Sequence, residues 1–142
     1  WSVGVVAEII MFAFAHVFLT RFSWRYLVSL CLVLTGIRWM IVGLLPNSFV
    51  AQFLAQTIHA FSFGLFHMIA MRVVFQNFSI GQQGRGQAMY STMWGLGVAL
   101  GSILAGRYWQ LISGEVIFII AGFATFIGLL FVRWLPKHIQ QA

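Results

Sequence analysis

Long apolar blocks separated by short polar or proline-containing breaks run the whole length of the 142-residue chain. Five such blocks cover about residues 1–20, 26–45, 49–75, 88–106 and 116–135, the first of them starting at Trp1. Each block is long enough to cross the roughly 30 Å hydrocarbon core of a bilayer as an α-helix, which rises about 1.5 Å per residue. The pattern therefore predicts an all-α membrane protein with five transmembrane helices.

The breaks between the blocks carry residues that commonly end helices. A short connector at about 21–25 follows the first block, and the second block ends at Pro46, because proline cannot continue a helix. A longer polar stretch at about 76–87 contains three glycines and is predicted to be a second loop. The fifth block is expected to stop at Pro136 and Lys137.

Basic residues are distributed unevenly between the two ends of the predicted helices. If consecutive helices alternate in direction, one side collects six basic residues, namely Arg21, Arg25, Arg72, Arg85, Arg133 and Lys137. The other side receives only Arg107 and Glu115. Cytoplasmic loops are enriched in Lys and Arg, so we expect a multi-pass protein of a bacterial-type inner (plasma) membrane with loops 21–25, 76–87 and the C-terminus in the cytoplasm.

Composition excludes several classes of protein. Hydrophobic residues make up 61% of the chain and charged residues only 7%, which is too little charge for a water-soluble surface. The net charge of +6 comes from scattered single residues, so we expect no nucleic-acid partner. The lone Cys31 lies inside an apolar block and is expected to be a buried thiol. No metal-ligand set, nucleophile elbow or phosphate loop is found, so we expect neither an enzyme nor a cofactor or metal.

Three ionisable residues, Glu8, Arg38 and His59, fall near the middle of predicted membrane helices. Such residues cost roughly 2.5 to 3.5 kcal/mol at a helix centre and commonly mark substrate or proton paths. Glu8 has no polar neighbour one helical turn away, so it is predicted to carry a proton, to bind a substrate group or to form a structural ion pair with Arg38. Arg38 requires a counter-charge from Glu8, from another helix or from an anionic substrate.

The third block carries a polar stripe. Positions three or four residues apart share one face of a helix, and here that face collects Gln52, Gln56, His59, Ser62 or Phe63, and Phe66. A stripe of this kind faces protein or water rather than lipid. It predicts either the wall of a substrate cavity or a set of hydrogen bonds between helices.

Two further features are interpreted as structural. Gly97 and Gly101 have the small-residue spacing that lets two membrane helices pack closely, and we expect them to form a helix-packing site. His16 and His67 lie nearer the predicted cytoplasmic ends, where polar residues are tolerated, and are predicted to be structural or interfacial.

Several of these residues occur in short segments that resemble a known family. The segments are Val3-Gly-Val-Val-Ala-Glu8, Gly36-Ile-Arg38-Trp, Gln56-Thr-Ile-His59, Met68-Ile-Ala-Met-Arg72 and Gln87-Ala-Met-Tyr90-Ser. Together they resemble the C-terminal half of major facilitator superfamily symporters, most of all the 3-phenylpropionate/proton symporters related to lactose permease. The resemblance covers essentially the whole chain and implies helices 8 to 12 of a twelve-helix protein, a fragment of a six-helix bundle.

The resemblance implies that Glu8, Arg38 and His59 line a central cavity and that transport proceeds by alternating access. The chain departs from lactose permease at Ser62, where that protein carries an acidic residue, and at Gln56, where it carries a lysine. Aromatic-acid symporters are similar to this chain in having neutral residues at both positions. A small aromatic carboxylate is therefore the favoured substrate, with protons, the lipid bilayer and an N-terminal half missing from this sequence as the other partners.

Other interpretations stay open from the sequence. A sugar or nucleoside symporter of the same superfamily would use the same architecture. A channel subunit would present rings of like residues in an oligomer. A non-transporting membrane scaffold would use its polar residues only to hold helices together.

Overall fold

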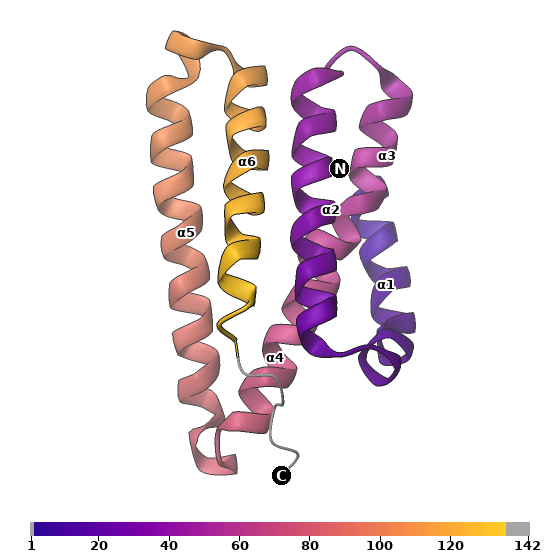
Figure 1. Cartoon of the computed structure of the whole chain (residues 1–142), viewed down its shortest axis with the longest axis vertical. Helices are drawn as coiled ribbons and strands as arrows, with labels where there is room; N and C mark the ends of the chain where they lie inside the picture. Colours follow the sequence, from indigo (N-terminus) through magenta and orange to yellow (C-terminus); the bar gives the residue numbers. More distant parts are fainter. Residues whose placement is uncertain (1, 136–142) are drawn as a thin grey trace.

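The structure is a computed structural model that describes residues 2–135, and the predicted all-α fold is confirmed (Figure 1). Trp1, Pro136 and Lys137 lie outside the described residues, and so do the predicted start of the first span and stop of the fifth. The elements are α1 (Ser2–Arg21), α2 (Trp24–Leu44), α3 (Phe49–His59), the π-helix η1 (Ala60–Leu65), α4 (Phe66–Asn77), the 3-10 turn η2 (Ile80–Gln82), α5 (Gln83–Ile112) and α6 (Gly114–Val132).

Five segments of the described chain are long and apolar enough to cross a membrane, as the sequence predicts. Three of them are α1, α2 and α6, and a fourth is the continuous run α3–η1–α4. The fifth joins η2 to α5. Large apolar side chains are exposed along all of these helices, which is the surface expected of a protein solvated by lipid rather than by water.

Serine side chains define two of the helix starts. The Ser23 hydroxyl accepts a hydrogen bond from the backbone N–H of Tyr26 at 3.4 Å, and Ser48 accepts one from Ala51 at 3.3 Å. These contacts satisfy backbone donors that an α-helix leaves unpaired at its first turn. They fix the connection from α1 to α2 and the turn at Pro46 that sends the chain back into α3 (Figure 1).

The polar stretch at 76–87 differs from the predicted loop. Helix α4 continues to Asn77 and α5 already begins at Gln83, so Phe78 and Ser79 alone separate α4 from η2. Gly86 explains the difference, because a Cβ atom there would lie 2.7 Å from Val74 and 2.8 Å from Phe78. This glycine allows a close approach of α5 to the end of α4 rather than a turn.

A small apolar core joins the helices of the first half of the chain. Its buried members come from α1, α2, η1 and α4 and are Met11, Leu27, Cys31, Ala60, Leu65 and Ile69. Cys31 is 0% exposed, so the predicted buried thiol is confirmed.

Close packing of glycines occurs between α2 and α6, which lie side by side (Figure 1). A Cβ atom at Gly36 would lie 2.5 Å from the Phe126 ring, and one at Gly43 would lie 2.6 Å from the backbone oxygen of Glu115. Opposite them, a Cβ atom at Gly122 would lie 3.1 Å from the Gly36 oxygen. Missing side chains at these positions let the two backbones approach each other.

The predicted packing site at Gly97 and Gly101 has no partner within the described chain. A Cβ atom at either position would meet nothing within 4 Å. Both lie on α5, and none of the residues in the apolar window of that span is buried against the other described helices. The small-residue spacing is present, but α5 packs far less extensively against α4 and α6 than α2 packs against α6. Close glycine contacts between helices occur at other positions, among them Gly36 and Gly43 of α2 against α6 and Gly86 against the end of α4.

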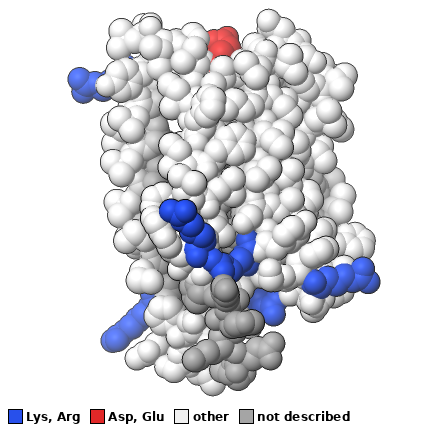
Figure 2. Space-filling view, viewed as in Figure 1, with Lys and Arg blue, Asp and Glu red and all other residues white. Residues whose placement is uncertain are grey.

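Basic side chains gather at one end of the helices. In Figure 2 most blue side chains lie over the middle and lower parts of the molecule, one blue and one red side chain lie near the top, and the belt between them shows no charge on this face. Arg25 donates to the backbone oxygens of Val132, at 3.1 Å, and of Arg133, at the end of α6. Arg72 donates to the oxygen of Leu19 near the end of α1. Positive charge at helix C-termini is electrostatically favourable.

Candidate functional site

The two membrane-embedded groups Glu8 and His59 meet. Helix α1 carries Glu8 and the last residue of α3 is His59, and these helices pack against each other. His59 Nε2 lies 2.9 Å from Glu8 Oε1, which is a hydrogen-bonding distance. The side chains are only 23% and 15% exposed, respectively. The partner that Glu8 requires from another helix is therefore a histidine.

Gln56 lies beside this pair, one turn before His59 on α3. A Cβ atom at Gly4 of α1 would lie 3.2 Å from Gln56 Oε1 and 3.3 Å from His59 Cδ2. Because Gly4 has no side chain, α1 can approach the polar face of α3 and bring Glu8 into reach. Gly64 of η1 also lies near Glu8, because a Cβ atom at Gly64 would be 3.8 Å from Glu8 Cγ.

Arg38 of α2 belongs to the same electrostatic environment but forms no salt bridge with Glu8. Arg38 is near enough to Glu8 and His59 to interact electrostatically with both. Among the described residues, however, the basic side chain within 4.0 Å of the Glu8 carboxylate is the His59 imidazole. The Arg38 guanidinium stacks on the neighbouring Trp39 ring, 4.3 Å from its centroid. Its buried Nε has no hydrogen-bond partner in the described chain. Of the alternatives considered for Glu8, the structural ion pair with Arg38 is thus not formed, and Glu8 contacts His59 instead.

The other predicted site residues separate into two groups. The buried hydroxyl of Ser62 in η1 has no hydrogen-bond partner among the described residues. The buried Nδ1 atom of His59 has none there either. Gln52, in contrast, donates from Nε2 to the backbone oxygen of Leu45 at 3.0 Å. That amide supports the turn between α2 and α3, two helical turns away from His59. The structure therefore brings Glu8, His59 and Gln56 together and leaves Gln52 at the far end of the stripe.

An aromatic cluster that sequence reasoning missed adjoins the polar pair. We define it as Phe63, His67, Tyr90 and Trp94, from η1, α4 and α5. The Phe63 ring stacks on His59 with 5.7 Å between centroids and lies 4.3 Å from the His67 ring. Trp94 approaches His67 edge to face at 4.4 Å, and Tyr90 approaches it at 5.5 Å. The spacing of four residues from 59 to 63 to 67 is the signal in the sequence that could have identified this row.

The π-helix η1 lies between the polar pair and α4. Short π-helical segments occur frequently at functional sites. Here the segment begins directly after His59 and contains both Ser62 and Phe63. His67 Nδ1 contacts the Phe63 backbone oxygen at 2.9 Å, so the imidazole is oriented by this segment as well. The sequence carries no proline in this region that would have indicated the irregularity.

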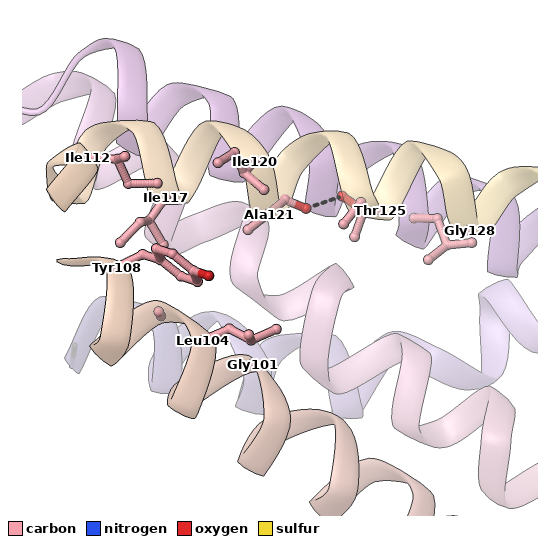
Figure 3. A pocket seen from close by; sticks show the side chains of 12 residues that line it. Gly101, Leu104, Tyr108, Ile112, Ile117, Ile120, Ala121, Thr125 and Gly128 are labelled. Atoms are coloured by element: carbon pink, nitrogen blue, oxygen red, sulfur yellow. Dashed lines mark hydrogen bonds between the residues drawn. The ribbon is translucent and has the colours of Figure 1, made fainter.

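An apolar cavity of about 530 Å³ lies elsewhere, between α5, α6 and Leu32 of α2 (Figure 3). Among its lining residues only Tyr108 and Thr125 carry polar side chains. The Thr125 hydroxyl donates within its own helix, to Ala121 at 3.2 Å and to Gly122 at 2.7 Å. Unlike the cluster around Glu8, this cavity offers no charged group to a polar substrate, so it is not the candidate site.

Comparison with known proteins supports a transport architecture. A profile of the MFS_1 like family matches residues 1–120. The chain is also 33% identical over 129 residues to a protein of Escherichia coli (strain K12) described as a probable 3-phenylpropionic acid transporter. That alignment covers 85% of this chain and 32% of the relative, so the chain spans about a third of the relative's length. No solved structure matches the chain at a significant level.

The match extends over more than four fifths of the chain and includes the helices that carry Glu8, Arg38 and His59. It agrees with the family resemblance of the short segments that contain these residues. The five apolar spans agree with it as well. The chain therefore belongs to the MFS_1 like family, within the major facilitator superfamily of multi-pass membrane transporters.

Proposed function

We propose that this chain forms part of the C-terminal bundle of a proton-coupled symporter for a small organic carboxylate. An aromatic acid such as 3-phenylpropionate is the favoured substrate, because the E. coli relative is described as a probable transporter of that compound. Transport would proceed by alternating access of a site near the membrane midplane. Helices outside this sequence, including an N-terminal half, would complete the cavity.

The observation that carries the proposal is the unpaired state of Arg38. An arginine stays charged at all physiological pH values, and its planar fork matches a carboxylate with two parallel hydrogen bonds. Within the described chain no carboxylate lies within salt-bridge distance of it, and its buried Nε is without a partner. A substrate carboxylate would supply the missing counter-charge.

The pair formed by Glu8 and His59 is the proposed proton site. While Glu8 is ionised, its carboxylate is held by His59 at 2.9 Å and interacts electrostatically with Arg38. Adding a proton to Glu8 neutralises the carboxylate and weakens its electrostatic attraction for both neighbours. The charge of Arg38 would then be offset less by Glu8 and would attract a substrate anion more strongly, so proton binding and substrate binding would favour each other.

The proposed orientation places the basic end of the bundle in the cytoplasm of a bacterial-type inner membrane. Support comes from Arg21, Arg25, Arg72 and Arg85, which lie at that end, whereas Arg107 and Glu115 flank the turn between α5 and α6 at the other. Basic residues in short loops favour retention on the cytoplasmic side.

The test uses the full-length protein in liposomes and measures uptake of labelled 3-phenylpropionate under an imposed pH gradient. Arg38→Lys should raise KM for the acid at least tenfold, because a point charge replaces a two-pronged contact. Glu8→Gln should abolish accumulation driven by the gradient while leaving exchange of internal for external substrate. Arg21→Lys, at an exposed residue of the basic end, is the matched control.

Three results would contradict the proposal. Gradient-driven uptake that survives unchanged in Glu8→Gln removes this residue from the proton path. Uptake of a sugar or a nucleoside in place of aromatic acids assigns a different substrate class. Absence of any uptake, with Glu8 and Arg38 together replaceable by apolar residues, supports a scaffold instead.

A further inference from the structure

The aromatic cluster is continuous with the polar pair rather than separate from it. His59 uses Nε2 for Glu8 and presents its ring face to Phe63, with an interplanar angle of 20°. Phe63 in turn approaches the Trp94 ring edge to face, at 6.0 Å between centroids. A row of ring faces therefore leads from the carboxylate of Glu8 on α1 to the indole of Trp94 on α5.

The rings of this row are held in place but are not fully covered. Tyr90 and Phe66 hold Trp94 from two sides, with 6.4 and 6.3 Å between ring centroids. Phe63 and Trp94 nevertheless each remain 37% exposed. Fixed aromatic faces that keep an open side can accept a further ring in the offset or edge-to-face arrangements that aromatic pairs prefer.

Other exposed aromatic residues within residues 2–135 lack this combination. Phe49 and Phe53 also approach each other, at 6.5 Å, but lie at the start of α3 away from the titratable pair. Exposure of such residues is explained by lipid. The cluster differs because its first ring stacks on the histidine of the proposed proton site.

We infer that Phe63 and Trp94 form the subsite for the aryl ring of the transported acid, beside the site that takes its carboxylate. The inference rests on the proposed function and assigns residues to substrate specificity. With the carboxylate at Arg38 and next to His59, a chain of two or three carbons would carry the ring along the row of aromatic faces. Recognition of the ring then depends on its π-face and not only on its apolar area.

The test compares two acids with the same carboxylate and side chain, 3-phenylpropionate and 3-cyclohexylpropionate, in the full-length protein. Their equilibrium binding ratio is measured by displacement of labelled 3-phenylpropionate. An aromatic pair is more stable than its buried area alone accounts for. Trp94→Leu and Phe63→Leu should therefore each reduce the preference for the phenyl acid by about two- to tenfold.

Controls separate this role from general packing. Trp94→Phe keeps an aromatic face and should preserve most of the ratio, and Trp109→Leu, at the opposite end of α5, should leave it unchanged. If Trp94→Leu does not fold, Trp94→Met replaces it, because methionine fills space flexibly without a ring. It should reduce the preference for the phenyl acid in the same way. A wild type that binds no aromatic acid would refute the proposed function. A wild type that binds the acid, with a ratio unaltered in the folded ring-free variants, would refute this inference alone.

Discussion

Gly43→Ala provides a sharp test of the contact between α2 and α6. The new Cβ atom would lie 2.6 Å from the backbone oxygen of Glu115 and 2.8 Å from Ile119 Cγ1. No rotation of a side chain relieves a clash with backbone, so α6 must shift. Overpacking of this kind costs about 1 to 3 kcal/mol, and the better helix propensity of alanine offsets about 1 kcal/mol of that. We expect a net loss of about 0 to 2 kcal/mol in unfolding free energy.

The matched control is Gly101→Ala. It is the same chemical change inside a helix, but the new Cβ atom meets nothing within 4 Å, so stability should be unchanged or rise by up to about 1 kcal/mol. Both variants of the full-length protein are heated in detergent, and the fraction that stays monodisperse is measured by size-exclusion chromatography. Gly43→Val should be worse than Gly43→Ala. Equal melting of the variants at positions 43 and 101 would refute the reasoning.

Three further predictions concern local contacts. Arg25→Ala should lower the unfolding free energy by about 1 to 2 kcal/mol, because the end of α6 loses charge-assisted hydrogen bonds. Arg21→Ala, at an exposed position, should change it little. Equal losses in the two variants would contradict this assignment. Ser48→Ala should lower the unfolding free energy by about 0.5 to 2 kcal/mol, because α3 loses its N-cap. Ser48→Asp should keep the cap and the stability. Equal loss in both variants would count against a capping role. Cys31 should resist maleimide labelling in native membranes and react only after unfolding in SDS, since its side chain is fully buried; rapid native labelling would contradict the packing of the core.

The number of spans could be predicted from the sequence because hydropathy and proline act locally. Block length alone identifies a membrane helix, and Pro46 ends α2 whatever surrounds it. The prediction of a loop at 76–87 was wrong because it depended on contacts between segments and not on local sequence. Its glycines suggested a loop, whereas Gly86 is required by contacts with Val74 on α4 and with Phe78 directly after that helix. The same limit applies to Gly97 and Gly101, whose spacing indicates a packing surface but not whether a neighbour covers it.

The sequence predicted which residues belong to the candidate site better than it predicted which of them contact each other. Depth in the membrane could be counted along each helix, so Glu8, Arg38 and His59 were identified together. Which two of them touch depends on the rotation of α1 and α2 about their axes, and no residue spacing within one helix determines that. Trp94 was missed because an aromatic residue in an apolar span has no distinctive sequence signal. Its relation to His59 exists only once α5 packs beside α4.

The π-helix η1 has a consequence for how this protein tolerates changes in length. Among the described residues it is the one π-helical segment, and it separates His59 from α4. A π-helical turn closes with i→i+5 instead of i→i+4 hydrogen bonds, so it holds one more residue than an α-helical turn. We therefore expect that removing one residue from η1, as a deletion at Ala60 would, restores an ordinary α-helix and leaves His67 against Trp94. A deletion within α4 before His67 would instead turn all that follows by about 100°. Homologues that are one residue shorter in η1 should thus accept the same substrate ring, whereas homologues shortened in α4 should not.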